Sequence, residues 1–132
     1  MDLVESSVRG KVEVIHQSKR LLRTRVSGPI GMTEANKILD VLESWMGETK
    51  DGLVAFHDGS AALAFDPGAR QKITAWSNAH IEPFAGVHIL VGNRATAWAI
   101  RVLVAILGAK IVAHHSMESF DAAFQKVRRS QM

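Results

Sequence analysis

The polar residues best placed to do chemistry in this 132-residue chain follow a short apolar run near its middle. Leu53-Val54-Ala55-Phe56 leads directly into His57-Asp58-Gly59-Ser60. A histidine beside an aspartate suits a base and its orienting carboxylate, and a serine suits a nucleophile. Neighbouring strand residues point to opposite faces of a sheet, however, and alanines follow Ser60 where a nucleophile turn needs glycine. We therefore predict no catalytic residue here and keep Asp58 and Ser60 as candidates for binding a partner or ligand.

A second polar pair, His114 and His115, lies close to the end of the chain. The two residues are adjacent, so a strand would point them to opposite faces, and no carboxylate stands at a ligand-like spacing beside them. The chain contains no cysteine, which excludes disulfides, thiolate metal sites and cysteine nucleophiles. We expect no metal, no cofactor and no enzymatic activity.

The residues from Ala95 to Leu107 form a predicted helix that is apolar on almost every side, with Arg101 as its single charge. In a two-layer domain one stripe of this helix faces the sheet, and the other side requires a neighbouring helix, a partner chain or an apolar ligand. Arg101 either points to water or contacts an interface or a ligand headgroup. Trp98 lies three positions before Arg101 and four before Val102, so it shares a side of the helix with each. Trp98, Arg101 and Val102 complete the candidate binding site.

Composition limits the classes of partner. The net charge is +3, with basic residues gathered at 19–25 and 126–129, but neither a helix-turn-helix spacing nor an aromatic platform accompanies them. Nucleic acid is therefore not predicted as a partner. The longest apolar run, Ala95 to Ala109, is shorter than the roughly 20 residues that span a bilayer, and the first ten residues carry no secretory signal. We expect a cytoplasmic protein that associates with itself through the helix 95–107.

Apolar periodicity divides the chain into one domain, residues 11–128, between an N-terminal arm at 1–10 and a C-terminal tail at 129–132. Lys11 to Gln17 and Leu21 to Val26 form a predicted antiparallel hairpin. Three further strands are predicted to run parallel, because helices join them: Leu53 to Phe56, Val87 to Val91 and Lys110 to Ala113. The pattern predicts an α/β fold with a single mixed five-stranded sheet and four helices.

Residues at the predicted boundaries support this division. Gly28-Pro29 is predicted to end the second strand, and Thr33 to cap the first helix. Asp66 and Ser116 are predicted to cap the second and last helices. Gly47 offers the first helix a C-terminal stop.

The element order and three stretches of sequence resemble the SpoIIAA-like or STAS fold, in an uncharacterised branch related in architecture to the CRAL-TRIO lipid carriers. The stretches are Leu53 to Asp58, Asp66 to Trp76, and Val87 to Val91 with the apolar helix that follows. The resemblance implies a non-enzymatic protein-binding or regulatory module that makes contacts through the loop Asp58 to Asp66 and the helix 95–107. The alternative is a carrier or sensor of a small apolar ligand such as a lipid.

The chain departs from that family at its regulatory motif. In the anti-sigma-factor antagonists the third strand ends in Asp-Ser-Ser/Thr-Gly-Leu/Val-Gly, with a phosphorylatable hydroxyl at a helix N-terminus. Here the segment reads Asp58-Gly59-Ser60-Ala61-Ala62-Leu63, so Ser60 is displaced by one place and the next helix cap is delayed to Asp66. This departure argues against a phosphorylation switch at Ser60.

Overall fold

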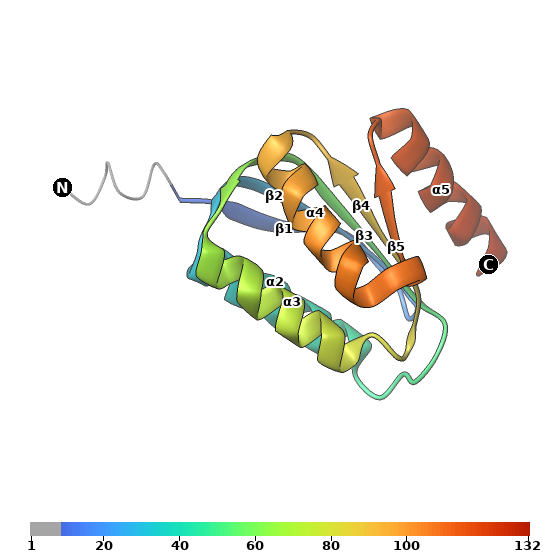
Figure 1. Cartoon of the computed structure of the whole chain (residues 1–132). Coiled ribbons are helices and arrows are strands. Elements are labelled where there is room, and N and C mark those ends of the chain that lie inside the picture. The colour runs from blue at the N-terminus through green and yellow to red at the C-terminus, as the bar shows by residue number, and fades with distance from the viewer. Residues whose placement is uncertain (1–8) are drawn as a thin grey trace.

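The computed structural model describes residues 9–132, and of residues 95, 96 and 99 it describes the backbone alone. The predicted N-terminal arm therefore lies outside the described residues except for its last two. Figure 1 shows a sheet with helices packed on both faces. The elements in chain order are β1 (Lys11–Gln17), β2 (Leu21–Ile30), α2 (Met32–Met46), β3 (Leu53–Phe65), α3 (Pro67–His80), β4 (Phe84–Val91), α4 (Arg94–Leu107), the short 3-10 helix η1 (Gly108–Lys110), β5 (Ile111–His114) and α5 (Met117–Ser130).

The described chain forms one five-stranded sheet with the strand order β1-β2-β3-β4-β5. β1 and β2 pair antiparallel as the hairpin pattern predicted, with Val12 opposite Val26. β2, β3, β4 and β5 are parallel neighbours, because a helix connects each of them to the next. The predicted mixed five-stranded sheet with four α-helices is thus confirmed for residues 9–132.

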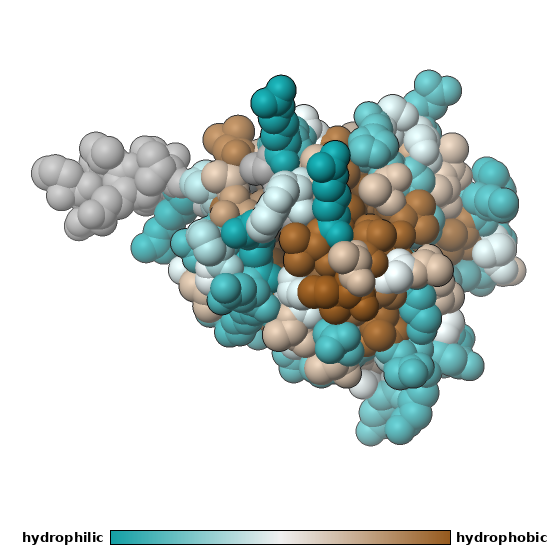
Figure 2. All heavy atoms as spheres, in the orientation of Figure 1, coloured by the Kyte–Doolittle hydropathy of each residue, from teal (hydrophilic) through white to brown (hydrophobic). Residues whose placement is uncertain are grey.

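The helices are divided unequally between the two faces of the sheet. Three helices, α2, α3 and α4, cover one face, and α5 lies on the other. The view of Figure 2, taken from the same direction as Figure 1, has an apolar area around α4. Trp98, Val104 and Ile106 of α4 are all exposed large hydrophobic residues. The helix that is apolar on almost every side therefore has one side on the sheet and one at the surface.

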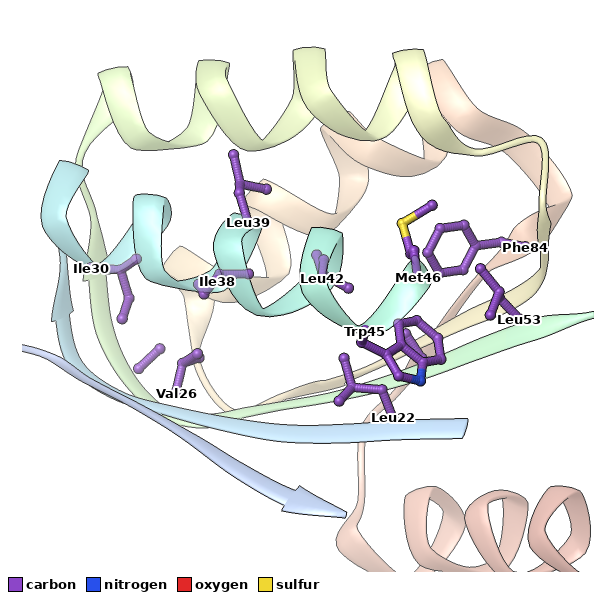
Figure 3. Close-up of a cluster of buried hydrophobic side chains, with 12 residues drawn as sticks. Leu22, Val26, Ile30, Ile38, Leu39, Leu42, Trp45, Met46, Leu53 and Phe84 are labelled. Atoms are coloured by element: carbon purple, nitrogen blue, oxygen red, sulfur yellow. The ribbon is translucent and has the colours of Figure 1, made fainter. Parts of the chain in front are cut away.

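The largest core cluster lies between α2 and the sheet, as Figure 3 shows. Leu22 and Leu53 of the strands pack against Leu42 and Trp45 of the helix. The Trp45 indole N–H is satisfied as well, because it donates to the Ser18 carbonyl oxygen at 2.7 Å. This cluster fixes α2 firmly, whereas α3 contributes a single fully buried residue, Ala69.

Helix ends follow the predicted caps with one exception. Asp66 accepts from the Ala69 N–H at 3.2 Å, and Ser116 accepts from the Ser119 N–H at 3.1 Å. Thr33 is not the cap of α2: the cap is Gly31, so the helix begins at Met32, two residues earlier than predicted. The Glu34 carboxylate accepts from the Gly31 N–H at 2.8 Å, so the acidic side chain, and not a hydroxyl, satisfies the helix start.

The loop predicted between Asp58 and Asp66 does not exist, because β3 continues to Phe65. Gly28-Pro29 does not end β2 either; that strand continues to Ile30, which pairs with Phe65. Two register shifts accommodate the Gly-Pro pair and its neighbours within the ladder. Pairing between the two strands thus overrides the weak strand propensity of the alanines after Ser60. β4 also begins earlier than predicted, at Phe84, and β5 occupies Ile111–His114.

Candidate functional site

A cavity of about 530 Å³ lies between α3, α4 and the sheet. This volume falls within the range of about 300 to 1,000 Å³ that is typical of small-molecule pockets. The exposed side chains of Trp98 and Ile106 belong to its lining, so the cavity reaches the surface. Its lining comprises Val26, Ile38, Leu42, His57, Gly59, Phe65, Arg70, Gln71, Ile73, Thr74, Ala75, Trp76, Ser77, Asn78, Ile81, Phe84, Val87, Ile89, Trp98, Ile100, Val102, Leu103, Ile106, Leu107 and Ile111.

Helix α4 borders the cavity with a stripe of side chains four residues apart. Trp98, Val102 and Ile106 form this stripe, which helical geometry places along one flank. Ile100 and Leu103, on the neighbouring side of the helix, pack against Ile89 and Ile111 of the sheet, and they line the cavity as well. The unusual hydrophobicity of α4 therefore has a structural cause, because the helix both packs on the sheet and lines the cavity.

Helix α3 forms the opposite wall. Ile73 and Trp76 are half-buried, and both line the cavity. The Trp76 indole N–H donates to the Glu43 carboxylate at 3.2 Å, and its ring stacks on His80 with ring centres 4.3 Å apart. At the end of this wall, Lys110 donates to the Ile81 carbonyl oxygen at 3.2 Å. These contacts hold α3 in place although the cavity lies beneath much of it.

Arg70 of α3 meets Trp98 of α4 at one part of the lining. The guanidinium carbon lies 3.9 Å from the centre of the indole ring, which is a cation–π contact. Both residues line the cavity. The Nε atom of Arg70 is buried and has no hydrogen-bond partner within residues 9–132.

His57 lies on the sheet side of the cavity. Its Nδ1 is hydrogen-bonded to the Thr24 hydroxyl at 2.7 Å, across the β2–β3 pairing in which the two residues are partners. Burial lowers the pKa of His57 to about 4, because the charged imidazolium is poorly solvated there. The ring is therefore neutral at pH 7 and adds no charge to the cavity.

Comparison with solved structures identifies the fold. An uncharacterised protein of the DUF3478 family with a SpoIIAA-like fold, from Shewanella loihica PV-4, superposes with a TM-score of 0.66 at 15% identity, over 87% of this chain and 93% of that one. The chain has the SpoIIAA-like fold. The murine Solute Carrier 26 family member A9 (Slc26a9) anion transporter superposes with a TM-score of 0.62 at 6% identity, over 95% of this chain and 24% of the transporter. No family and no curated protein matches the sequence itself.

The SpoIIAA-like fold separates the predicted site residues into two groups. Trp98 and Val102 line the cavity together. Arg101 is exposed and does not belong to the lining. Asp58 and Ser60 lie on β3, and Asp58 has Leu90 as its partner on the neighbouring strand. His57 lines the cavity whereas Asp58 does not, as the alternation along a strand requires.

Asp58 and Ser60 are hydrogen-bonded to each other within β3. The buried Asp58 carboxylate accepts from both the N–H and the hydroxyl of Ser60, at 2.9 and 2.6 Å. Gly92, just beyond β4, touches the same point: a Cβ there would lie 2.4 Å from the Ser60 carbonyl oxygen. Glycine at position 92 is therefore required by close packing. Ser60 stands inside a strand and not at a helix N-terminus.

The opposite face of the SpoIIAA-like sheet contains a series of polar side-chain contacts under α5. His88 Nδ1 and His114 Nε2 are 2.8 Å apart, and His114 Nδ1 is 2.6 Å from the Ser119 hydroxyl of α5. Phe56 stacks on His88 with ring centres 4.3 Å apart. We assign these contacts to the packing of α5 on the sheet, because the cavity lies on the other face of the sheet.

None of the helices within residues 9–132 combines the length and the hydropathy that a bilayer crossing needs. In the same part of the chain, no three histidine or carboxylate side chains gather closely enough to hold a metal ion.

Of the predicted binding residues, the cavity is lined only by Trp98 and Val102, so Arg70 and His57 are among the lining residues that were not predicted. A pattern could have pointed to Arg70, which shares a helical side with Ile73, Thr74 and Ser77.

Proposed function

We propose that this protein is a non-enzymatic binding module that holds a small apolar ligand in the cavity between α3 and α4. The observation that carries the proposal is the cavity itself, about 530 Å³ in volume and lined mainly by apolar side chains from the sheet and three helices. A cavity of this kind weakens a fold, because its lining loses dispersion contacts on one side. A bound apolar molecule would restore those contacts.

The composition of α4 supports the same function. Trp98, Val102 and Ile106 would be costly choices on a surface helix, but they suit a wall that a ligand touches. The neutral form of His57 suits such a ligand too, because the sheet side of the cavity carries no charge at pH 7. The absence of cysteine agrees with a reducing cytoplasm, where we place this activity.

A second proposed function is contact with a protein partner or with a second copy of the chain through α4. Val104 favours it, because this residue is 41% exposed and does not line the cavity. Trp98 and Val102, by contrast, belong to the cavity wall, so the flank first predicted for self-association has another use. We therefore place ligand binding ahead of self-association.

Titration with N-phenyl-1-naphthylamine, a neutral apolar dye that becomes fluorescent in apolar surroundings, tests the first function. The wild-type protein should bind the dye with a saturable increase in fluorescence. Thr74→Trp places a large side chain in the cavity lining and should abolish that increase. Ser44→Trp adds the same side chain at an exposed position of α2 outside the lining and should leave binding unchanged.

The dye titration contradicts the proposal if the wild type gives no saturable increase. It also contradicts the proposal if Thr74→Trp, still folded by circular dichroism, binds the dye as the wild type does. Equal loss in both tryptophan variants would show that filling the cavity is not what abolishes binding, and would contradict the cavity as the dye site.

A further inference from the structure

We infer that the ligand of this cavity is an apolar chain that ends in a carboxylate, and that Arg70 binds the carboxylate. The inference rests on the proposed function and adds to it the chemical class of the ligand.

The lining has a single charged side chain at pH 7. Arg70 supplies that charge, and no acidic residue belongs to the lining among the residues that the structure describes. The remaining polar members, such as Gln71, Thr74 and Ser77, are neutral. A cation bordering an otherwise uncharged and mainly apolar cavity favours a ligand with one negative charge, because a charge without a partner gains most from one of opposite sign.

The contact with Trp98 leaves the Arg70 donors available. A guanidinium uses its flat face when it stacks on an indole ring, whereas its N–H groups point outward in the plane. The guanidinium carbon is 3.9 Å from the ring centre, and Arg70 forms no ion pair within residues 9–132. The edge that carries the two terminal nitrogens can therefore donate to both oxygens of a carboxylate side by side.

The accessibility of its nitrogens indicates which edge of Arg70 is used. The Nε atom is buried and makes no hydrogen bond in the described part of the chain, so a ligand atom does not reach it from the cavity. The two terminal nitrogens are not buried in this way. They are therefore the donors that a ligand carboxylate would meet.

Competition between two ligands of equal chain length tests the inference. Decanoate and decan-1-ol are each used to displace N-phenyl-1-naphthylamine from the wild type, Arg70→Gln and Arg101→Gln at neutral pH. Hydrogen bonds to a charged group predict that the wild type binds decanoate at least about tenfold more tightly than the alcohol. Arg70→Gln should lose this preference and keep its affinity for decan-1-ol. Arg101→Gln removes the same charge from an exposed position of α4 and should retain the preference.

Three results would overturn the inference. Equal displacement by decanoate and decan-1-ol in the wild type would reject the carboxylate and leave the apolar cavity standing. Loss of the preference in Arg101→Gln, or equal weakening of both ligands in Arg70→Gln, would reject Arg70 as the group that binds it. Failure of the dye and of both ligands to bind any variant would contradict the proposed function as well.

Discussion

Arg70 on α3 and Trp98 on α4 are stacked, with the guanidinium carbon 3.9 Å from the centre of the indole ring. The contact joins two helices that both line the cavity. It places the single cation of the lining where the cavity meets the surface, since Trp98 is 52% exposed. The pair thus links α3 to α4, and it also holds the cation that we propose to bind the ligand carboxylate.

The stacked pair should be measurable in the stability of the protein without ligand. A double-mutant cycle of Trp98→Ala and Arg70→Gln, followed by urea denaturation, should give a coupling of about 0.5 to 1 kcal/mol. Trp98→Phe keeps an aromatic ring and should retain part of the coupling. Additive effects of the two substitutions would show that the stack does not join the helices in solution.

Stability should decrease as the pH is lowered from 7 to 5. Burial lowers the pKa of His57 and of His88 from 6.5 to about 4, and burial also lowers the pKa of His114. Between pH 6.5 and pH 4 the unfolded chain binds protons that the folded chain does not, so stability is highest above pH 6.5 and is lost as the pH falls. His57 contributes a slope of up to about 1.4 kcal/mol per pH unit, and solvent screening makes the contributions of His88 and His114 smaller.

Urea denaturation at a series of pH values measures this slope. His88→Phe keeps the ring that packs against Phe56 and removes one titrating group, so its slope should be smaller than that of the wild type. A free energy of unfolding that stays constant or increases between pH 7 and pH 5 would contradict the assignment of these histidines as buried and neutral.

Phe124 should be needed for the docking of α5. Its ring is 4% exposed and packs edge-on against Phe56, so Phe124→Ala removes buried apolar surface and leaves a cavity. We expect a loss of about 3 to 5 kcal/mol in the free energy of unfolding, read from the urea midpoint. Gln125→Ala, at the exposed neighbouring position, should change stability little. A midpoint unaffected by Phe124→Ala would mean that α5 is not docked in solution.

Self-association through α4 is testable with a pair of substitutions on the same helix. Val104 is exposed outside the cavity lining, whereas Val102 belongs to it. If copies associate through the exposed side, sedimentation should show a dimer for the wild type at micromolar concentration and a monomer for Val104→Glu. Val102→Glu should impair dye binding more than association. A wild type that remains monomeric over the concentration series would contradict self-association.

Local sequence patterns predicted most of the fold. The alternation of apolar and polar residues predicted β1 and β2, and a short apolar run predicted β3. Asp66, Ser116 and Gly47 cap helix ends through hydrogen bonds to residues three or four positions away, so they too are visible in the local sequence. The extension of β3 to Phe65 depends instead on pairing with β2, a partner that is more than thirty residues away in the sequence. No local pattern carries that information, so the Asp58 to Asp66 loop was predicted wrongly.

The binding site was less predictable for a related reason. The hydrophobicity of α4 predicts that a second side of the helix has a neighbour, and on that helix Trp98 and Val102 line the cavity. What lies opposite them depends on how far α3 stands from α4, which is a property of the packed helices. Arg70 and His57 became candidates only when the fold placed them on the same cavity. Arg101, the obvious charge in the sequence, is exposed.

The most direct test of the cavity as a binding site locates the ligand by NMR. Isoleucine methyl groups labelled with ¹³C report on the cavity and on the rest of the domain, because Ile73 and Ile106 line the cavity whereas Ile15 and Ile30 do not. With decanoate bound, intermolecular NOEs from the ligand chain should reach the Ile73 and Ile106 methyl groups and not those of Ile15 or Ile30. NOEs confined to Ile15 or Ile30, or none at a saturating ligand concentration, would contradict binding between α3 and α4.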